Sequence, residues 1–137
     1  MRVRSSRFGD LDVEDAAVIE FPSGLIGLGG SRYALVATDE DSPFRWLQSV
    51  DDPDLALPVT NPFAFFGDYA VDLSEGDSER VGTEDPSAVD VWVIVRAAPE
   101  PRDATANLKA PIVVHGGRGF QIINEAPGVD VRTPLFG

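Results

Sequence analysis

The chain has 137 residues, 43% of them hydrophobic, no cysteine and a formal net charge of −12. Such a chain can bury a core without disulfides, and the lack of cysteine excludes thiol catalysis and thiolate metal sites. The excess of carboxylates argues against direct nucleic-acid binding. It either favours basic partners or serves solubility alone, as in the acid-rich proteins of salt-adapted organisms. No segment reaches the ~18 apolar residues of a membrane span, and no apolar run follows the N-terminal residues as in a signal peptide. The composition predicts a soluble, intracellular protein.

Short runs rich in β-branched and aromatic residues follow one another along the chain, separated by turn-forming residues. Near the N-terminus two strands, 2–8 and 11–13, flank a tight reversal predicted at Gly9-Asp10. Further strands are predicted, in chain order, at 18–21, 32–37, 44–50, 55–60, 69–73, 88–97, 111–115, 119–123 and 129–133. Their length and spacing are typical of an all-β barrel or sandwich.

Only two segments favour a helix. Residues 14–17 could form one turn, and residues 74–82 a short helix that Gly82 is placed to end. Neither segment shows a sustained 3.6-residue apolar stripe. We therefore predict an all-β fold: a single compact antiparallel β-barrel-like domain over residues 1–137, with one or two short helical turns.

Two predicted strands are informative face by face. Residues 88–97 are apolar on both faces near the middle, which predicts a central strand covered on both sides. In residues 44–50, Phe44, Trp46 and Gln48 share one face. If Gln48 is buried it must find partners, because an unsatisfied amide costs about 1–3 kcal/mol. Gln48 is then either a structural amide that ties a neighbouring loop or a contact with a partner.

Signatures of catalysis and of cofactor binding are missing from the sequence. His115 is the only histidine, and its place before Gly116-Gly117 predicts a surface or turn histidine. There is no nucleophile elbow and no phosphate-binding or dinucleotide fingerprint, and the glycine-rich residues 24–31 contain no lysine. The carboxylate-rich runs lack the spacing of a calcium loop and are expected to be solvated turns. We expect no catalytic residue, no metal site and no cofactor.

Six collinear blocks carry a family resemblance. They are residues 21–28, 43–69, 89–95, 104–114, 120–124 and 131–136. The Leu-Gln-Ser of residues 47–49, the Asn-Pro before the phenylalanines and the Ala-Asn-Leu-x-Ala-Pro motif are specific in combination. On these blocks the chain resembles the flagellar assembly factor FliW family along nearly its whole length.

The resemblance implies a non-enzymatic regulator with a compact β-barrel-like fold that binds flagellin in the cytoplasm. It also implies binding to CsrA, a small RNA-binding repressor of flagellin messenger RNA, which is released when accumulating flagellin captures the regulator. No direct nucleic-acid partner, membrane or small-molecule substrate is expected. Two alternatives stay open: a small-ligand-binding β-barrel, which requires an internal cavity, and an enzyme with an unrecognised carboxylate pair.

The segment NPFAFFGDY, residues 61–69, holds four aromatic rings. Strict alternation breaks between Phe65 and Phe66, and Pro62 cannot donate to a central ladder, which predicts an edge or a corner between strands. Two interpretations stay open: all four rings belong to the core, or Phe66 or Tyr69 helps to form an interface.

The other candidate segment is ATANLKAP, residues 104–111, predicted to be a rigid loop that leads into a strand. It is either a structural turn or, through Asn107 and Lys109, a contact with flagellin or CsrA. The predicted partner-binding residues are in total Phe44, Gln48, Phe66, Tyr69, Asn107 and Lys109.

Overall fold

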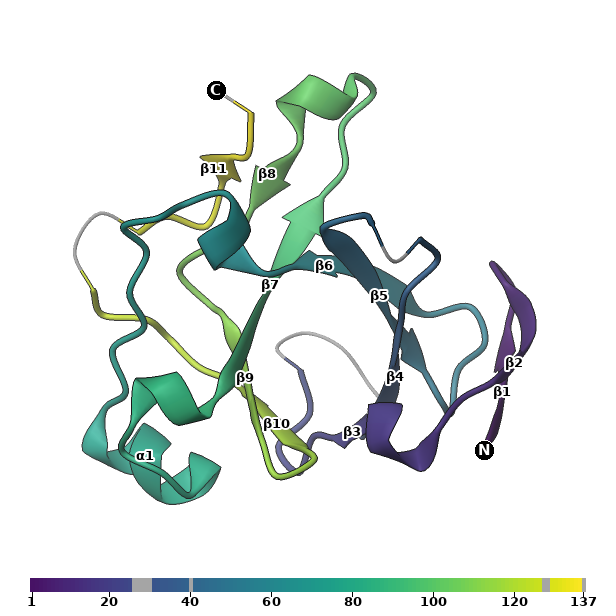
Figure 1. Ribbon diagram of the computed structural model, residues 1–137, viewed down its shortest axis with the longest axis horizontal. Helices are drawn as coiled ribbons and strands as arrows, with labels where there is room; N and C mark the ends of the chain where they lie inside the picture. The colour runs from purple at the N-terminus through teal and green to yellow at the C-terminus, as the bar shows by residue number, and fades with distance from the viewer. Residues whose placement is uncertain (26–30, 40, 127–128, 137) are drawn as a thin grey trace.

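Seven strands close into a ring in the computed structural model, which describes residues 1–25, 31–39, 41–126 and 129–136 (Figure 1). The seven are β3 (Val18–Glu20), β4 (Arg32–Val36), β5 (Phe44–Ser49), β6 (Ala56–Thr60), β7 (Asp90–Arg96), β9 (Ile112–His115) and β10 (Arg118–Gln121). Their order is β7-β6-β5-β4-β3-β10-β9, and an additional pairing of β7 with β9 closes the barrel. The predicted all-β barrel is confirmed.

One pairing in the ring departs from the predicted antiparallel arrangement. β10 and β3 run parallel, through Arg118 opposite Glu20, whereas the other ring pairings are antiparallel. This pair joins the first strand of the barrel to the last, so no hairpin connects them and no turn fixes their relative direction.

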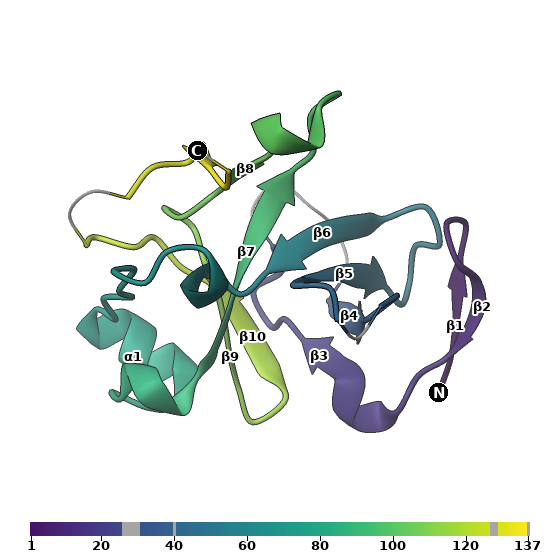
Figure 2. The same cartoon turned by 45° about the horizontal axis from the view of Figure 1, so that its top comes forward.

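The remaining strands extend from the ring or lie against it. β1 (Arg2–Ser5) and β2 (Gly9–Asp12) form a separate hairpin, which lies on the opposite side of the barrel from the helix (Figures 1 and 2). β8 (Thr105–Ala106) pairs with the end of β7, and β11 (Thr133–Pro134) pairs with β8. No helix within the described residues is long and apolar enough to span a membrane.

Both predicted helical segments are confirmed. η1 (Asp15–Ala17) is a single 3-10 turn, and α1 (Glu75–Val81) is a two-turn helix. Ser74 and Asp77 form a reciprocal capping box at the start of α1, and Gly82, with φ 94°, ends it. Asp77 is therefore buried, in contrast to the solvated carboxylate that its acidic run predicts.

Three further 3-10 turns were not predicted: η2 (Pro62–Ala64), η3 (Pro86–Ala88) and η4 (Pro101–Asp103). Each begins with proline, whose fixed φ and missing N–H suit the first position of a helical turn. Asn61 caps η2 and Asp85 caps η3, each by accepting a hydrogen bond from a backbone N–H. The signal for these turns was therefore present in the sequence.

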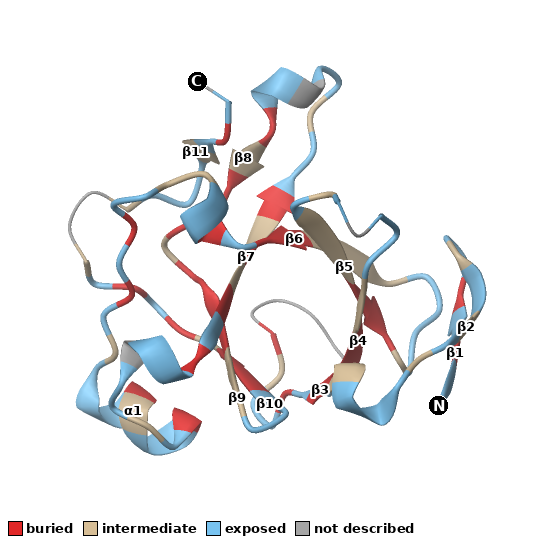
Figure 3. Ribbon diagram, in the orientation of Figure 1, coloured by how far each residue is buried: buried red, intermediate tan, exposed pale blue. Residues whose placement is uncertain are grey.

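The core consists of two clusters on opposite faces of the barrel wall. One, the inner cluster, includes Tyr33, Leu47, Val59 and Ile112, all almost fully buried. The other, the outer cluster, joins residues of the wall to Val81 of α1 and to Leu135 near the C-terminus. Figure 3 marks the buried positions along the strands in red. In β7 the three valines at 91, 93 and 95 belong to the outer cluster, while the alternate residues 92 and 94 pack against the inner one. The prediction of a strand covered on both sides is confirmed.

Several predicted boundaries are wrong. Residues 69–73 form no strand, and of the strand predicted at 129–133 only Thr133 pairs, within β11. The first reversal lies at residues 6–8, and Gly9, with φ 75°, already opens β2. A three-residue loop followed by a left-handed glycine is a common hairpin solution. Turn-forming residues also predict turns at 27–31, 39–43 and 126–128, and each of these turns lies partly outside the described residues.

Candidate protein-interaction site

Five phenylalanines gather where β6 leaves the barrel and the C-terminal segment passes by. Phe65 is central: its ring centroid lies 5.8 Å from that of Phe44, 6.5 Å from Phe66 and 5.7 Å from Phe136. Phe63 precedes Phe65 in the same turn, and its ring lies against that of Tyr69, with the centroids 5.8 Å apart. Phe63 and Phe136 are each 47% exposed. We call Phe44, Phe63, Phe65, Phe66 and Phe136 the aromatic patch. Exposed clustered rings of this kind often mark protein contacts.

Local chemistry explains why the chain exposes Phe63. The Thr60 hydroxyl donates to the Pro43 carbonyl oxygen at 2.7 Å at the end of β6. Asn61 then accepts a hydrogen bond from the Phe63 N–H at 2.9 Å, and Pro62 begins η2. The predicted corner is confirmed, but the interpretation that all four rings are core is wrong, because the turn projects Phe63 outward while Tyr69 is buried. Whether Phe66 and Tyr69 contact a partner stays a prediction.

A groove adjoins the aromatic patch and shares Phe66 with it. Its volume is about 370 Å³, and three chain segments form its walls. The lining residues are Phe66, Asp68, Tyr69, Ala70, Leu108, Ala126, Val129 and Thr133. We call this the apolar groove. It brings together residues of the two segments, 61–69 and 104–111, that the sequence analysis predicts as candidate partner-binding segments.

The Tyr69 hydroxyl ties two walls of the apolar groove together. It donates to the Leu108 carbonyl oxygen at 2.9 Å and accepts from the Asn124 amide nitrogen Nδ2 at 3.2 Å. Burial raises the pKa of Tyr69, and the hydrogen bond from Asn124 only partly opposes this. The hydroxyl therefore stays protonated and keeps its role as a donor at neutral pH.

Asn124 is a residue that sequence reasoning missed, although it ends the block at 120–124. It is fully buried, and its Nδ2 also donates to the Ala70 carbonyl oxygen at 2.9 Å. Its Oδ1 accepts from the backbone N–H groups of Asp72, at 3.2 Å, and Ala126, at 3.1 Å. The backbone N–H of Asn124 donates to the backbone carbonyl oxygen of Lys109 at 2.7 Å. One side chain thus fixes the backbone of the groove walls.

Asn107 and Lys109 flank Leu108 and are half-buried. The Asn107 Oδ1 accepts from the backbone N–H groups of Lys109, at 3.2 Å, and Ala110, at 3.1 Å. This is the Asx-turn geometry expected of a structural turn. The Nδ2 amide takes no part in that turn, so the turn role and a partner contact are compatible.

Gln48 lies apart from the aromatic patch and is fully buried. Its Nε2 lies 3.1–3.4 Å from four backbone carbonyl oxygens, those of Ser49, Asp52, Pro53 and Leu55. Its Oε1 has no hydrogen-bond partner within the described residues. These contacts support the interpretation of Gln48 as a structural amide that ties the β5–β6 loop, since it presents no surface to a partner.

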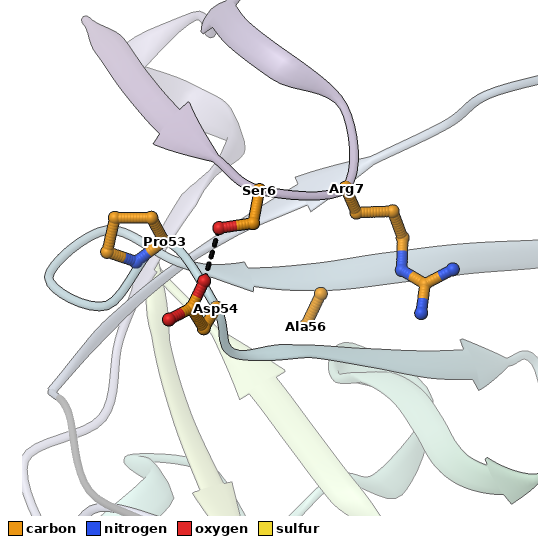
Figure 4. A pocket seen from close by; sticks show the side chains of 5 residues that line it. All are labelled: Ser6, Arg7, Pro53, Asp54 and Ala56. Atoms are coloured by element: carbon orange, nitrogen blue, oxygen red, sulfur yellow. Dashed lines mark hydrogen bonds between the residues drawn. The ribbon is translucent and has the colours of Figure 1, made fainter.

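The β1–β2 hairpin docks on that loop and leaves a second concavity. It measures about 450 Å³ and is lined by Ser6, Arg7, Pro53, Asp54 and Ala56 (Figure 4). The Ser6 hydroxyl donates to the Asp54 carboxylate, as the dashed line in Figure 4 shows. The Arg7 guanidinium lies 4.4 Å from the centre of the Trp46 ring. Because these contacts hold the hairpin to the barrel, we interpret the concavity as a packing seam.

A third concavity, of about 290 Å³, lies among β3, β4, β7 and β9 and includes Leu35, Trp92 and His115. His115 ends β9 and lies beside the Gly116-Gly117 turn, as predicted, with Nδ1 3.3 Å from the Ala88 carbonyl oxygen. Within the described residues, no group of three or more histidine, aspartate or glutamate side chains is arranged to hold a metal ion.

A closed seven-strand barrel, with an aromatic patch and an adjoining apolar groove on its surface, defines the chain as a β-barrel protein. Comparison with known proteins gives the family. The sequence model of the FliW protein family matches residues 2–135. The chain belongs to the FliW family of flagellar assembly factors, and the resemblance stated from the six sequence blocks is confirmed.

Individual relatives match nearly the whole of this chain. The chain is 35% identical to the flagellar assembly factor FliW of Geobacter sulfurreducens, over 99% of this chain and 87% of that protein. It is 37% identical to the flagellar assembly factor FliW of Heliobacterium modesticaldum, over 99% of this chain and 91% of that protein. A crystal structure of the flagellar assembly factor FliW matches with a TM-score of 0.88 and 28% identity, covering 100% of this chain and 98% of that one.

Proposed function

We propose that this protein is a non-enzymatic flagellar assembly factor that binds flagellin in the cytoplasm and antagonises the translational regulator CsrA. By exchanging one partner for the other, it couples flagellin synthesis to flagellin secretion. Membership of the FliW family over residues 2–135 supports the assembly role. A partner switch requires binding surfaces rather than a reactive centre.

The observation that carries the proposal is the aromatic patch. Phe63 and Phe136 are each 47% exposed, although the Phe63 ring contacts Tyr69 and the Phe136 ring contacts Phe65. Aromatic side chains are enriched at the centres of protein interfaces, where they supply much of the binding free energy. A patch of this composition next to an apolar groove fits a protein ligand.

Charge supports the second partner. The net charge of −12 attracts a basic protein over long distances and raises its association rate. An RNA-binding protein such as CsrA carries a basic surface by necessity, because it must neutralise phosphates. An acidic antagonist is therefore electrostatically matched to it.

Co-purification tests the proposal. The protein would be mixed with flagellin and with CsrA separately, and then with both in competition, at low and at high salt. We expect a stable complex with each, displacement of CsrA by flagellin, and the greater salt sensitivity for CsrA. Phe63→Ser should weaken binding, while Leu11→Ser, on the distant β1–β2 hairpin, serves as the matched control. Failure of both partners to bind the wild-type protein contradicts the proposal.

The alternative of a small-ligand barrel rests on the concavity that contains Trp92. Barrel mouths are common ligand sites, and this one combines apolar side chains with Asp90 and His115. It predicts a metabolite-dependent rise in melting temperature that Trp92→Ala abolishes. The alternative fails if no metabolite in a broad screen shifts the melting temperature.

A further inference from the structure

We propose that the apolar groove binds an amphipathic helix of the partner protein, with large apolar side chains facing the groove and lysine or arginine on the helix flanks. The inference rests on the proposed function, because it names the kind of segment through which a partner is recognised. Lining, backbone hydrogen bonding and charge each support it.

The lining selects apolar side chains. Leu108, Val129 and Phe66 contribute aliphatic and aromatic surface, and all three belong to or pack against the outer cluster. The volume of about 370 Å³ is sufficient for a few large side chains. A stripe of residues at positions i, i+3 and i+4 on a helix presents such side chains side by side.

The hydrogen bonding of the walls favours a helix over an added strand. The Leu108 N–H donates to the backbone carbonyl oxygen of Asp130, and the Leu108 carbonyl oxygen accepts from the Tyr69 hydroxyl. The Ala70 carbonyl oxygen and the Asp72 N–H are taken by Asn124. These backbone groups are thus occupied, whereas β-augmentation needs a row of free ones. A helix satisfies its own backbone and needs only side-chain contact.

The nearest sheet edge is also unsuited to strand addition. β11 is two residues long, and one of them is Pro134, which has no N–H to donate. An extended partner segment would therefore find little to pair with beside the apolar groove.

Charge around the apolar groove selects basic flanks. Asp68 lines it, and three further exposed carboxylates lie within two residues of a lining residue in the chain: Asp72, Glu125 and Asp130. The cations beside its lining residues are Lys109 and Arg132. Within the described residues none of the four carboxylates forms an ion pair, so they are free to meet cations of a partner. Complementary rim charges raise the association rate and fix orientation.

Two fluorescent model peptides of about 18 residues, or five helical turns, test the inference. Both carry the same leucine stripe, and one has lysine flanks while the other has glutamate flanks. Fluorescence anisotropy with the full chain should show the lysine peptide binding at least about tenfold more tightly than the glutamate peptide. Equal binding of the two peptides would overturn the inference.

Variants locate the binding. Ala70→Trp fills the apolar groove from an exposed position, and Asp68→Lys reverses a lining charge. Each should weaken binding of the lysine peptide at least about fivefold. The controls, Ala16→Trp in η1 and Asp10→Lys in β2, should change it less than about twofold. If Asp10→Lys weakens binding as much as Asp68→Lys, the peptide follows the overall negative charge and the inference is wrong.

The same variants separate this inference from the proposed function. If flagellin and CsrA co-purify with Ala70→Trp and Asp68→Lys as well as with the wild-type protein, the helix site is wrong and the proposed function stands. If the lysine peptide binds as expected but neither protein co-purifies with the wild type, the groove stands and the proposed function is wrong.

Discussion

The hydroxyl of Tyr69 donates a 2.9 Å hydrogen bond to the carbonyl oxygen of Leu108, which lies 39 residues further along the chain. The bond crosses from one wall of the apolar groove to the other, and both residues line it. Because Asn124 donates to the same hydroxyl, the geometry of the groove depends on a buried polar network. Substitutions in that network should therefore change stability and partner binding together.

Tyr69→Phe should destabilise the protein by about 1–2 kcal/mol at neutral pH, because it leaves the buried Leu108 carbonyl oxygen without its donor. It should also reduce the alkaline pH dependence. Burial raises the pKa of Tyr69, so the unfolded state loses its phenolic proton first as the pH rises. The resulting stabilisation is complete below about pH 10 and is lost as the pH rises through the folded-state pKa.

Urea denaturation of both proteins between about pH 8 and pH 11 measures this effect. The wild-type midpoint should fall more steeply than that of Tyr69→Phe. Part of the decline should remain in the variant, because the pKa of Tyr33 is also raised, first by burial and then by Asp52 and Asp51. Parallel declines in the two proteins would contradict the prediction.

Asn124→Ala should be among the most destabilising single changes, by roughly 2–4 kcal/mol, because it removes several buried hydrogen bonds at once. Hydrogen exchange should become faster at the Asp72 N–H, because in the wild type this group donates a hydrogen bond to the Asn124 Oδ1. Ile123→Thr is the control, since Ile123 is adjacent in the chain but 47% exposed. A small loss of stability in Asn124→Ala, equal to that of the control, would show that the network is not needed.

Gln48→Glu should destabilise the fold by at least about 3 kcal/mol at neutral pH. A carboxylate would replace the Nε2 donor among four carbonyl oxygens in a fully buried position. Gln48→Met, which has a similar volume and no charge, should be the milder change. Thermal denaturation of the two variants compares their losses of stability. A smaller loss in Gln48→Glu than in Gln48→Met would contradict the placement of Nε2 among the four carbonyl oxygens.

The barrel was predictable because its strands carry local signals. The valines of β7 alternate with Trp92 and Ile94, and both faces proved to be covered. The strand predicted at 69–73 failed although its pattern is real: Tyr69 and Val71 do belong to the outer cluster. What the pattern does not reveal is that a side chain more than 50 residues away, that of Asn124, bonds this backbone in place of a neighbouring strand.

The candidate site was predictable in its segments but not in its geometry. Pro62 and the break in alternation predict the corner, but they do not show that it is a 3-10 turn capped by Asn61 that exposes Phe63. The contribution of Phe136 depends on the path of the C-terminal segment, which places its ring 5.7 Å from Phe65. Such long-range contacts have no local signature in one sequence.

Gly119→Ala and Gly76→Ala form a pair of opposite sign. A Cβ on Gly119 would lie 2.5 Å from the ring of Phe21 and 2.9 Å from the Ile19 side chain, so we expect a loss of about 1–3 kcal/mol. Gly76 lies within α1 and a Cβ there meets nothing within 4 Å, so alanine should stabilise the fold by about 0.5–1 kcal/mol. Melting temperatures of the two variants should move in opposite directions, and a shared direction would refute the packing at β10.

Asn107→Asp separates the turn role of Asn107 from a partner contact. Aspartate keeps the Oδ1 acceptor for the Lys109 and Ala110 N–H groups, so the melting temperature should stay within ~2 °C of the wild type. Loss of the amide donor and the added charge should weaken pull-down of flagellin or CsrA if Asn107 touches either one. Asn107→Ala, which removes the turn acceptor, is the control and should lower stability by about 1 kcal/mol. Normal pull-down by Asn107→Asp would leave Asn107 with the turn role alone.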